Sequence, residues 1–159
     1  MKQPTPFFVS YARRDLADVD RFRLVLEPLL KASSEFAFGE WIDQQILPGE
    51  HWRAEIDRAL ERSRFGLLLV SPEFLASEFI TREELPVLLA KLMVVPVALQ
   101  RIVFDGTMDL KGLEDRQVFR DAKGRPFDRC RSMPARRDFA GELFSKIVAL
   151  LRKHPSAGG

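Results

Sequence analysis

The feature that most constrains the fold is a continuous apolar segment, Phe65–Val70 (FGLLLV), which lies between segments with helical periodicity. A strand without polar alternation is typical of the centre of a parallel sheet that is covered on both faces. Short apolar segments also occur at Thr5–Ser10 and Val94–Leu99, and a weaker one at Phe36–Ile42. We therefore predict four strands. Because Pro96 cannot donate a hydrogen bond, the strand at Val94–Leu99 is expected at an edge or with a bulge.

Amphipathic segments separate these strands. Apolar residues recur at steps of three and four over Asp15–Leu30, Trp52–Leu60 and Asp138–Lys153, which predicts three helices. Ser71 and Pro72 predict the start of a further helix, because Ser is a favoured N-cap and Pro a favoured first-turn residue. Strands that alternate with helices predict an α/β domain with a parallel sheet. A short additional strand is predicted at Gln117–Arg120.

Length and composition indicate one soluble domain. The chain has 159 residues, of which 46% are hydrophobic, so it can bury a sizeable core. Its formal net charge of +2 argues against a dedicated nucleic-acid binder. Cys130 is the only cysteine, which fits a reducing, cytoplasmic compartment, and we find neither a signal peptide nor a membrane-spanning segment. We expect one domain over residues 1–153, with residues 154–159 as a flexible tail or the start of a linker.

Several common catalytic motifs are absent from the sequence. No Gly-x-Gly-x-x-Gly follows the first predicted strand, and no P-loop or nucleophile elbow occurs. The two histidines, His51 and His154, are too few for a zinc site. We therefore expect a site without a metal or resident cofactor, built from carboxylates, hydroxyls and aromatic rings. In parallel α/β sheets such sites lie outside the carboxyl ends of the strands, here at residues 10–15, 43–50 and 71–84.

Four sequence motifs follow one another in a characteristic order. They are Phe8–Tyr11 (FVSY), Trp41–Asp43 (WID), the segment Ile46–Trp52 with its Pro48-Gly49, and Leu68–Leu85 with its final Glu84-Leu85. Together these motifs resemble those of TIR (Toll/interleukin-1 receptor/resistance) domains, in particular bacterial ones. The resemblance is strong from Pro6 to Leu89 and weaker through Gln117–Pro126 to the last helix.

The resemblance implies a flavodoxin-like, three-layer fold with a five-stranded parallel sheet of order 2-1-3-4-5. It also implies an NAD+ nucleosidase that cleaves the bond between nicotinamide and ribose, is activated by self-assembly, and serves as an effector of bacterial antiphage defence. NAD+ is then the substrate, and a fused or associated sensor domain is the expected partner. Two alternatives stay open: a TIR interaction module without catalysis, and a transferase or cyclase that acts on the same ribosyl intermediate.

By this resemblance Glu84 is the catalytic residue. The sequence also allows a structural interpretation, because Thr81–Glu84 (TREE) matches a capping box with Thr81 as N-cap. The register is open by one residue: the pairing with Leu85 selects Glu84, whereas counting from Phe79 selects Glu83.

The other substrate-binding candidates each have a structural alternative. Tyr11 either stacks on the substrate or packs in the core, and Ser10 either binds substrate or ends the strand. Arg13, or its neighbour Arg14, either meets the pyrophosphate, whose geometry suits arginine, or is solvated. Asp43 either orients a ribose or a neighbouring subunit's loop, or is a turn residue.

The remaining candidates lie on the second predicted helix, on the loop before it and after the third strand. Trp52 either packs against the core or lines the rim of the site, and Ser71 is expected to cap a helix rather than to bind ribose. The loop residues Ile46, Leu47, Pro48 and Gly49 are the expected oligomerisation loop. A basic cluster is interpreted as a solvated face, because no aromatic residue interleaves with it: Arg129, Arg131, Arg136 and Arg137.

Overall fold

The computed structural model describes residues 1–46, 58, 61–77, 93–110, 112–113 and 118–155. Within them, four strands form one parallel sheet of order β2-β1-β3-β4. The strands are β1 (Gln3–Ala12), β2 (Phe36–Ile46), β3 (Phe65–Val70) and β4 (Met93–Ala98). The predicted parallel α/β architecture is therefore confirmed.

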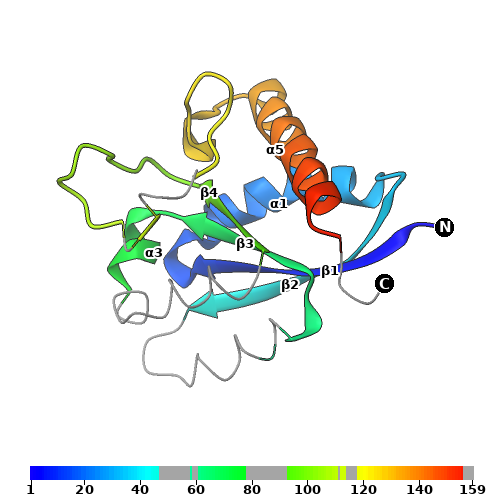
Figure 1. Ribbon diagram of the computed structural model, residues 1–159. Helices are drawn as coiled ribbons and strands as arrows, with labels where there is room; N and C mark the ends of the chain where they lie inside the picture. Colours follow the sequence, from blue (N-terminus) through cyan, green and yellow to red (C-terminus); the bar gives the residue numbers. More distant parts are fainter. Residues whose placement is uncertain (47–57, 59–60, 78–92, 111, 114–117, 156–159) are drawn as a thin grey trace.

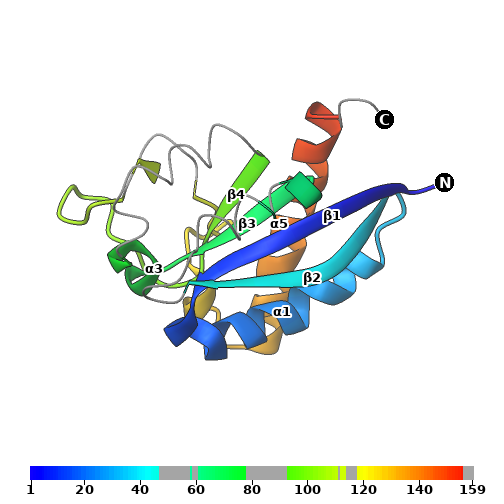
Figure 2. The same ribbon diagram turned by 90° about the horizontal axis from the view of Figure 1, so that it is seen from below.

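Helices cover both faces of this sheet (Figures 1 and 2). Helices α1 (Leu16–Lys31) and α5 (Met133–Lys153) pack side by side on one face, and the short helix α3 (Pro72–Ala76) packs on the other. Two 3-10 turns, Arg13–Asp15 and Phe127–Arg129, connect these elements. The three-layer arrangement is that of the flavodoxin-like fold.

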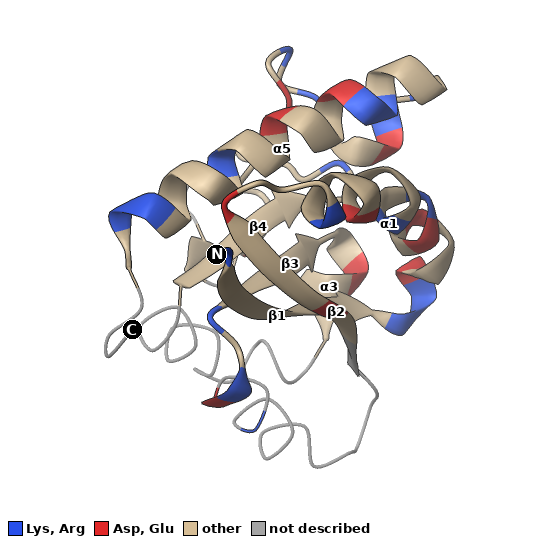
Figure 3. Cartoon of the chain, turned by 90° about the vertical axis from the view of Figure 1, so that its right-hand side faces the viewer, with Lys and Arg blue, Asp and Glu red and all other residues tan. Residues whose placement is uncertain are grey.

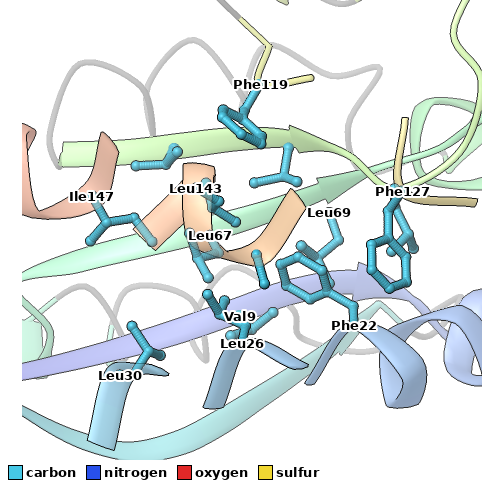
Figure 4. Packing of buried hydrophobic residues seen from close by; sticks show 14 of the residues in the cluster. Val9, Phe22, Leu26, Leu30, Leu67, Leu69, Phe119, Phe127, Leu143 and Ile147 are labelled. Carbon is cyan, nitrogen blue, oxygen red and sulfur yellow. The ribbon is translucent and has the colours of Figure 1, made fainter. Parts of the chain in front are cut away.

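The period of two along each strand divides the core into two clusters. Val9, Leu67 and Leu69 face α1 and α5, where they meet an aromatic group that includes Phe22 and Phe127 (Figure 4). Phe8, Leu68, Val70 and Ala98 face the other way, against Phe74 of α3 and the segment after β4. Charged residues are concentrated on the helices and loops, and the strands are almost free of them (Figure 3).

Gly66 occupies the centre of β3 because the neighbouring strand leaves no room for a side chain. A Cβ atom at this position would lie 2.4 Å from Cζ of the Phe8 ring. Phe8 and Gly66 are paired in register across β1 and β3, so the ring fills the space above the glycine. The sheet thus places a bulky aromatic side chain beside a glycine.

Pro96 lies in β4, which is an edge strand of the described sheet, as its missing N–H donor predicts. Phe119 pairs with this edge through an isolated parallel bridge to Val97. The amide of Phe119 donates to the carbonyl of Pro96 at 2.8 Å, and its carbonyl accepts from the amide of Ala98 at 2.9 Å. The bridge continues the order 2-1-3-4 at the position expected for a fifth strand. Within the described residues it does not extend into one.

Two predicted boundaries are wrong. Residues 43–46, expected in a loop, belong to β2, where Asp43 pairs with Val9 and Gln44 with Ser10. An edge strand tolerates polar residues, so the polar sequence there hid the strand. The last helix begins at Met133 rather than at Asp138, because Ser132 caps it and Pro134 occupies its first turn. The helix predicted at Trp52–Leu60 lies largely outside the described residues.

Candidate functional site

The carboxyl ends of β1, β3 and β4 meet at one edge of the sheet. Asp15 follows β1, Ser71 follows β3 and Gln100 follows β4. The hydroxyl of Ser71 donates a hydrogen bond to Oδ2 of Asp15, and Nε2 of Gln100 donates to Oδ1 of Asp15 at 3.3 Å. Because both oxygens of one carboxylate accept these bonds, Asp15 ties the ends of three adjacent strands together.

Asp15 is 4% exposed, and its charge is poorly solvated. Burial raises the pKa of this carboxyl above its ordinary value, and the nearby charges of Asp18 and Glu73 act in the same direction. The hydrogen bonds from Ser71 and Gln100 oppose this shift without cancelling it. Such a group stabilises the fold most when it is protonated.

A second layer of acidic groups surrounds Asp15. The carboxylate of Asp18 accepts a hydrogen bond from Nε2 of Gln100 at 2.8 Å and one from Arg21 at 3.0 Å. Burial also raises the pKa of Asp128, and the charge of Asp18 contributes to that shift. Among the described residues, no three His, Cys, Asp or Glu side chains are grouped so that they could hold a metal ion.

Sequence analysis did not identify Asp15 or Gln100 as members of this group. Asp15 was expected to begin a helix and to end the segment 10–15 at the carboxyl edge, without a role of its own, and Gln100 lies in a segment without a clear pattern. A signal was nevertheless present, because Gln100 comes directly after the predicted strand Val94–Leu99 and Asp15 ends the segment 10–15 that follows the first predicted strand of the parallel sheet. Ser71 has the structural role that was expected for it: its hydroxyl accepts a hydrogen bond from the amide of Phe74 at 3.0 Å and caps α3.

The two candidates at the end of β1 are fully buried. Tyr11 has no exposed surface and belongs to the core cluster under α1 and α5, so its ring packs in the core, as the alternative interpretation holds. Ser10 is also fully buried, between Gln44 of β2 and Leu68 of β3. Its hydroxyl has no hydrogen-bond partner among the described residues.

The arginines after β1 are exposed. Arg13 lies in the 3-10 turn, and no ion pair joins it to any residue that the structure describes. Arg14 lies 3.8 Å from the carboxylate of Glu73, and its side chain is 83% exposed. Arg14 therefore fits the solvated interpretation, whereas Arg13 is free to meet an anion at the carboxyl edge.

Asp43 lies within β2 and not in a turn, which overturns the turn interpretation of this residue. Its backbone pairs with Val9, so it stands beside the carboxyl half of β1. Ile46 is the last residue of β2 and pairs with Ala12. The other predicted site residues lie outside the described part of the chain: Leu47, Pro48, Gly49, Trp52 and Glu84.

The parallel sheet and its strand order define a flavodoxin-like α/β domain, with a group of polar side chains at the carboxyl ends of β1, β3 and β4. The sequence profile of one such family, described as "TIR domain", matches residues 7–131. The chain therefore belongs to the TIR-domain family, and the resemblance seen in its motifs is confirmed. No curated protein matches the chain.

A separate observation concerns membranes. In the part of the chain that the structure describes, no helix is both long enough and apolar enough to cross one.

Proposed function

We propose that this TIR domain is an NAD+ nucleosidase in which Glu84 stabilises the transition state. The observation that carries the proposal is membership of a family that includes NAD-cleaving members, together with the Glu84-Leu85 pair of the family's catalytic motif. The proposal extends to self-assembly as the activating step and to a role as effector of bacterial antiphage defence.

The chemistry requires few groups from the protein. Nicotinamide leaves NAD+ as a neutral pyridine because its ring nitrogen is already cationic, so the leaving group needs no general acid. This differs from ordinary glycosidases, which use a pair of carboxyl groups. A single carboxylate beside the ribose can accept hydrogen bonds from the hydroxyls and stabilise the oxocarbenium-like charge. A site with one glutamate and without a metal is consistent with this reaction.

The arrangement of the described strands supports this proposal. Asp43 on β2 and Ser10 on β1 belong to adjacent strands, with Gln44 paired directly to Ser10. The hydroxyl of Ser10, which has no hydrogen-bond partner among the described residues, is a donor and an acceptor on this strand. Arg13 supplies an exposed positive charge at the same end of β1, suited to the pyrophosphate of NAD+.

Self-assembly is proposed because the loop with Pro48 and Gly49 follows the end of β2, next to the strands that form the site edge. In relatives this loop commonly packs on a neighbouring domain. A head-to-tail contact of this kind extends into a filament if its rotation does not close.

The test is the release of nicotinamide from NAD+, followed by chromatography over a series of protein concentrations. We expect specific activity to rise with concentration, in parallel with assembly measured by light scattering, and Gly49→Pro to reduce both. Activity that is high and independent of concentration would contradict activation by assembly. Assembled wild-type protein that releases no nicotinamide would instead identify an interaction module, and a cyclic product would identify a cyclase.

A further inference from the structure

A pocket of about 360 Å³ lies at the carboxyl end of β4, between two segments that are far apart in the sequence. Both segments, residues 99–110 and 118–132, extend from this end of the strand (Figure 1). None of the residues proposed for NAD+ cleavage lines the pocket. Its lining combines four arginines with an aromatic ring, a glycine and three other apolar residues: Arg101, Arg120, Arg125, Arg129, Phe104, Gly124, Ala98, Ile102 and Pro126.

The pocket is strongly basic. Arg101, Arg120 and Arg129 form no ion pair with any of the residues that the structure describes. Among the described residues, Arg125 is paired with Asp121 alone, through a bond of 2.8 Å from its Nε atom. Four arginines that line one concave surface, with one paired carboxylate among the described residues, create a positive potential that attracts anions.

One of these guanidinium groups is oriented by the aromatic ring. The guanidinium carbon of Arg120 lies over the ring of Phe104, 4.6 Å from its centroid. Phe104 is 43% exposed, so it is a wall of the pocket rather than part of the core. Stacking uses the face of the guanidinium and leaves the N–H donors on its edge available. Two of these donors can bind two oxygens of one phosphate group at the same time.

The second segment is held rigidly by Asp121. Its carboxylate accepts hydrogen bonds from the amides of Lys123 and Arg125 at 3.0 and 2.7 Å, in addition to the bond from the Arg125 side chain. Gly124 completes this turn with a φ of +75°, which L side chains rarely adopt. The turn positions Arg125 before any ligand arrives, and preorganisation of this kind reduces the cost of binding.

We propose that this pocket binds a phosphorylated ligand of mononucleotide size, with its phosphates on the arginines and its base near Phe104. The pocket volume is at the lower end of the range for small-molecule sites. Several guanidinium groups match a group with two or more negative charges better than they match one carboxylate. The exposed aromatic ring provides a surface on which a base can stack. This proposal does not depend on the NAD+ reaction.

The test is isothermal titration calorimetry of the whole chain with ADP, inorganic pyrophosphate and adenosine at about 0.15 M salt. We expect ADP to bind more tightly than pyrophosphate, and adenosine to give no detectable binding. The double variant Arg120→Gln/Arg129→Gln should weaken ADP binding by about tenfold or more, because each lost charge-assisted bond is costly. Arg120→Lys, which keeps the charge and loses the planar fork, should give a smaller loss.

The matched control is Arg131→Gln/Arg137→Gln, which removes the same charge from exposed arginines outside the pocket. It should change ADP affinity by less than about twofold, as expected for distant surface charges. Equal losses in the two double variants would overturn the proposal in favour of a nonspecific charge effect. Unchanged ADP binding in Arg120→Gln/Arg129→Gln, or no ADP binding at millimolar concentration, would overturn it as well. Thermal unfolding of each variant separates a lost site from a lost fold.

Discussion

The hydroxyl of Ser71 donates its hydrogen to the buried carboxylate of Asp15 and at the same time accepts a hydrogen bond from the amide of Phe74. One side chain therefore caps α3 and fixes the segment after β1 to the segment after β3. The site region of a parallel α/β domain lies at these strand ends, so this pair determines how rigid the edge of the site is.

Ser71→Ala should lower the free energy of unfolding by about 2–4 kcal/mol, because it removes a helix cap and leaves a buried carboxylate with one partner fewer. Urea unfolding followed by circular dichroism measures the change. Ser132→Ala is the matched control, since Ser132 caps α5 through the amide of Ala135 at 3.2 Å in an exposed setting. The control should cost only about 0.5–1 kcal/mol. Equal losses in the two variants would show that the bond to Asp15 contributes little.

The raised pKa of Asp15, which burial causes, predicts a specific pH dependence. When the folded-state pKa exceeds the unfolded value, the folded protein binds more protons in the interval between them. The stabilisation is complete below the unfolded pKa of about 3.9 and is lost as the pH rises through the folded pKa. Asp15→Asn removes this titration. The wild-type stability minus that of Asp15→Asn should therefore decrease as the pH rises from about 4, measured by urea unfolding at several pH values. A difference that does not vary with pH would contradict the prediction.

Gly66→Ala should destabilise the protein by about 1–3 kcal/mol, the usual cost of overpacking a core. The added methyl group would lie 2.4 Å from the Phe8 ring in the centre of the sheet. The matched control is Gly141→Ala in α5, where a Cβ meets nothing within 4 Å. That variant should gain up to about 1 kcal/mol from helix propensity. Thermal or urea unfolding measures both changes, and Phe8→Leu should partly rescue Gly66→Ala if the ring is the cause.

Cys130 should be dispensable for activity. Its thiol is buried, and burial raises its pKa, so little of it is present as the reactive thiolate. Cys130→Ser should leave NAD+ cleavage unchanged within a few-fold, and a thiol reagent should label the native protein much more slowly than the unfolded one. Complete loss of activity in a folded Cys130→Ser protein would indicate thiol chemistry.

The strands could be predicted from sequence wherever burial on both faces produced a continuous apolar run, as in Phe65–Val70, whose predicted and observed boundaries coincide. The polar end of β2 could not be predicted from sequence, because an edge strand does not require an apolar pattern. The resemblance to TIR domains was sufficient to identify the family. Local sequence did not show that Asp15 and Gln100 meet, because 85 positions separate them and only the sheet order brings them together.

The arginine pocket was missed for a similar physical reason. Arg129 was grouped with its sequence neighbours Arg131, Arg136 and Arg137 as a solvated face without an aromatic residue. In the folded chain it lies instead with Arg101 and Arg120, and Phe104 supplies the ring. A binding surface assembled from separate loops has no local sequence signature, so it becomes visible only when the strands fix the positions of those loops.

If Glu84 is the catalytic residue, removing its charge should slow the release of nicotinamide. Glu84→Gln keeps the shape of the side chain and removes its charge, so nicotinamide release should fall by about 10²–10³-fold, or roughly 3–4 kcal/mol of transition-state stabilisation. Glu83→Gln is the matched control and should change the rate by less than about tenfold, because most substitutions outside the catalytic machinery have mild effects. Both variants must retain the wild-type circular dichroism spectrum and assembly. If Glu83→Gln abolishes release and Glu84→Gln does not, the catalytic position is one residue earlier, and if neither changes the rate, the glutamate mechanism is wrong.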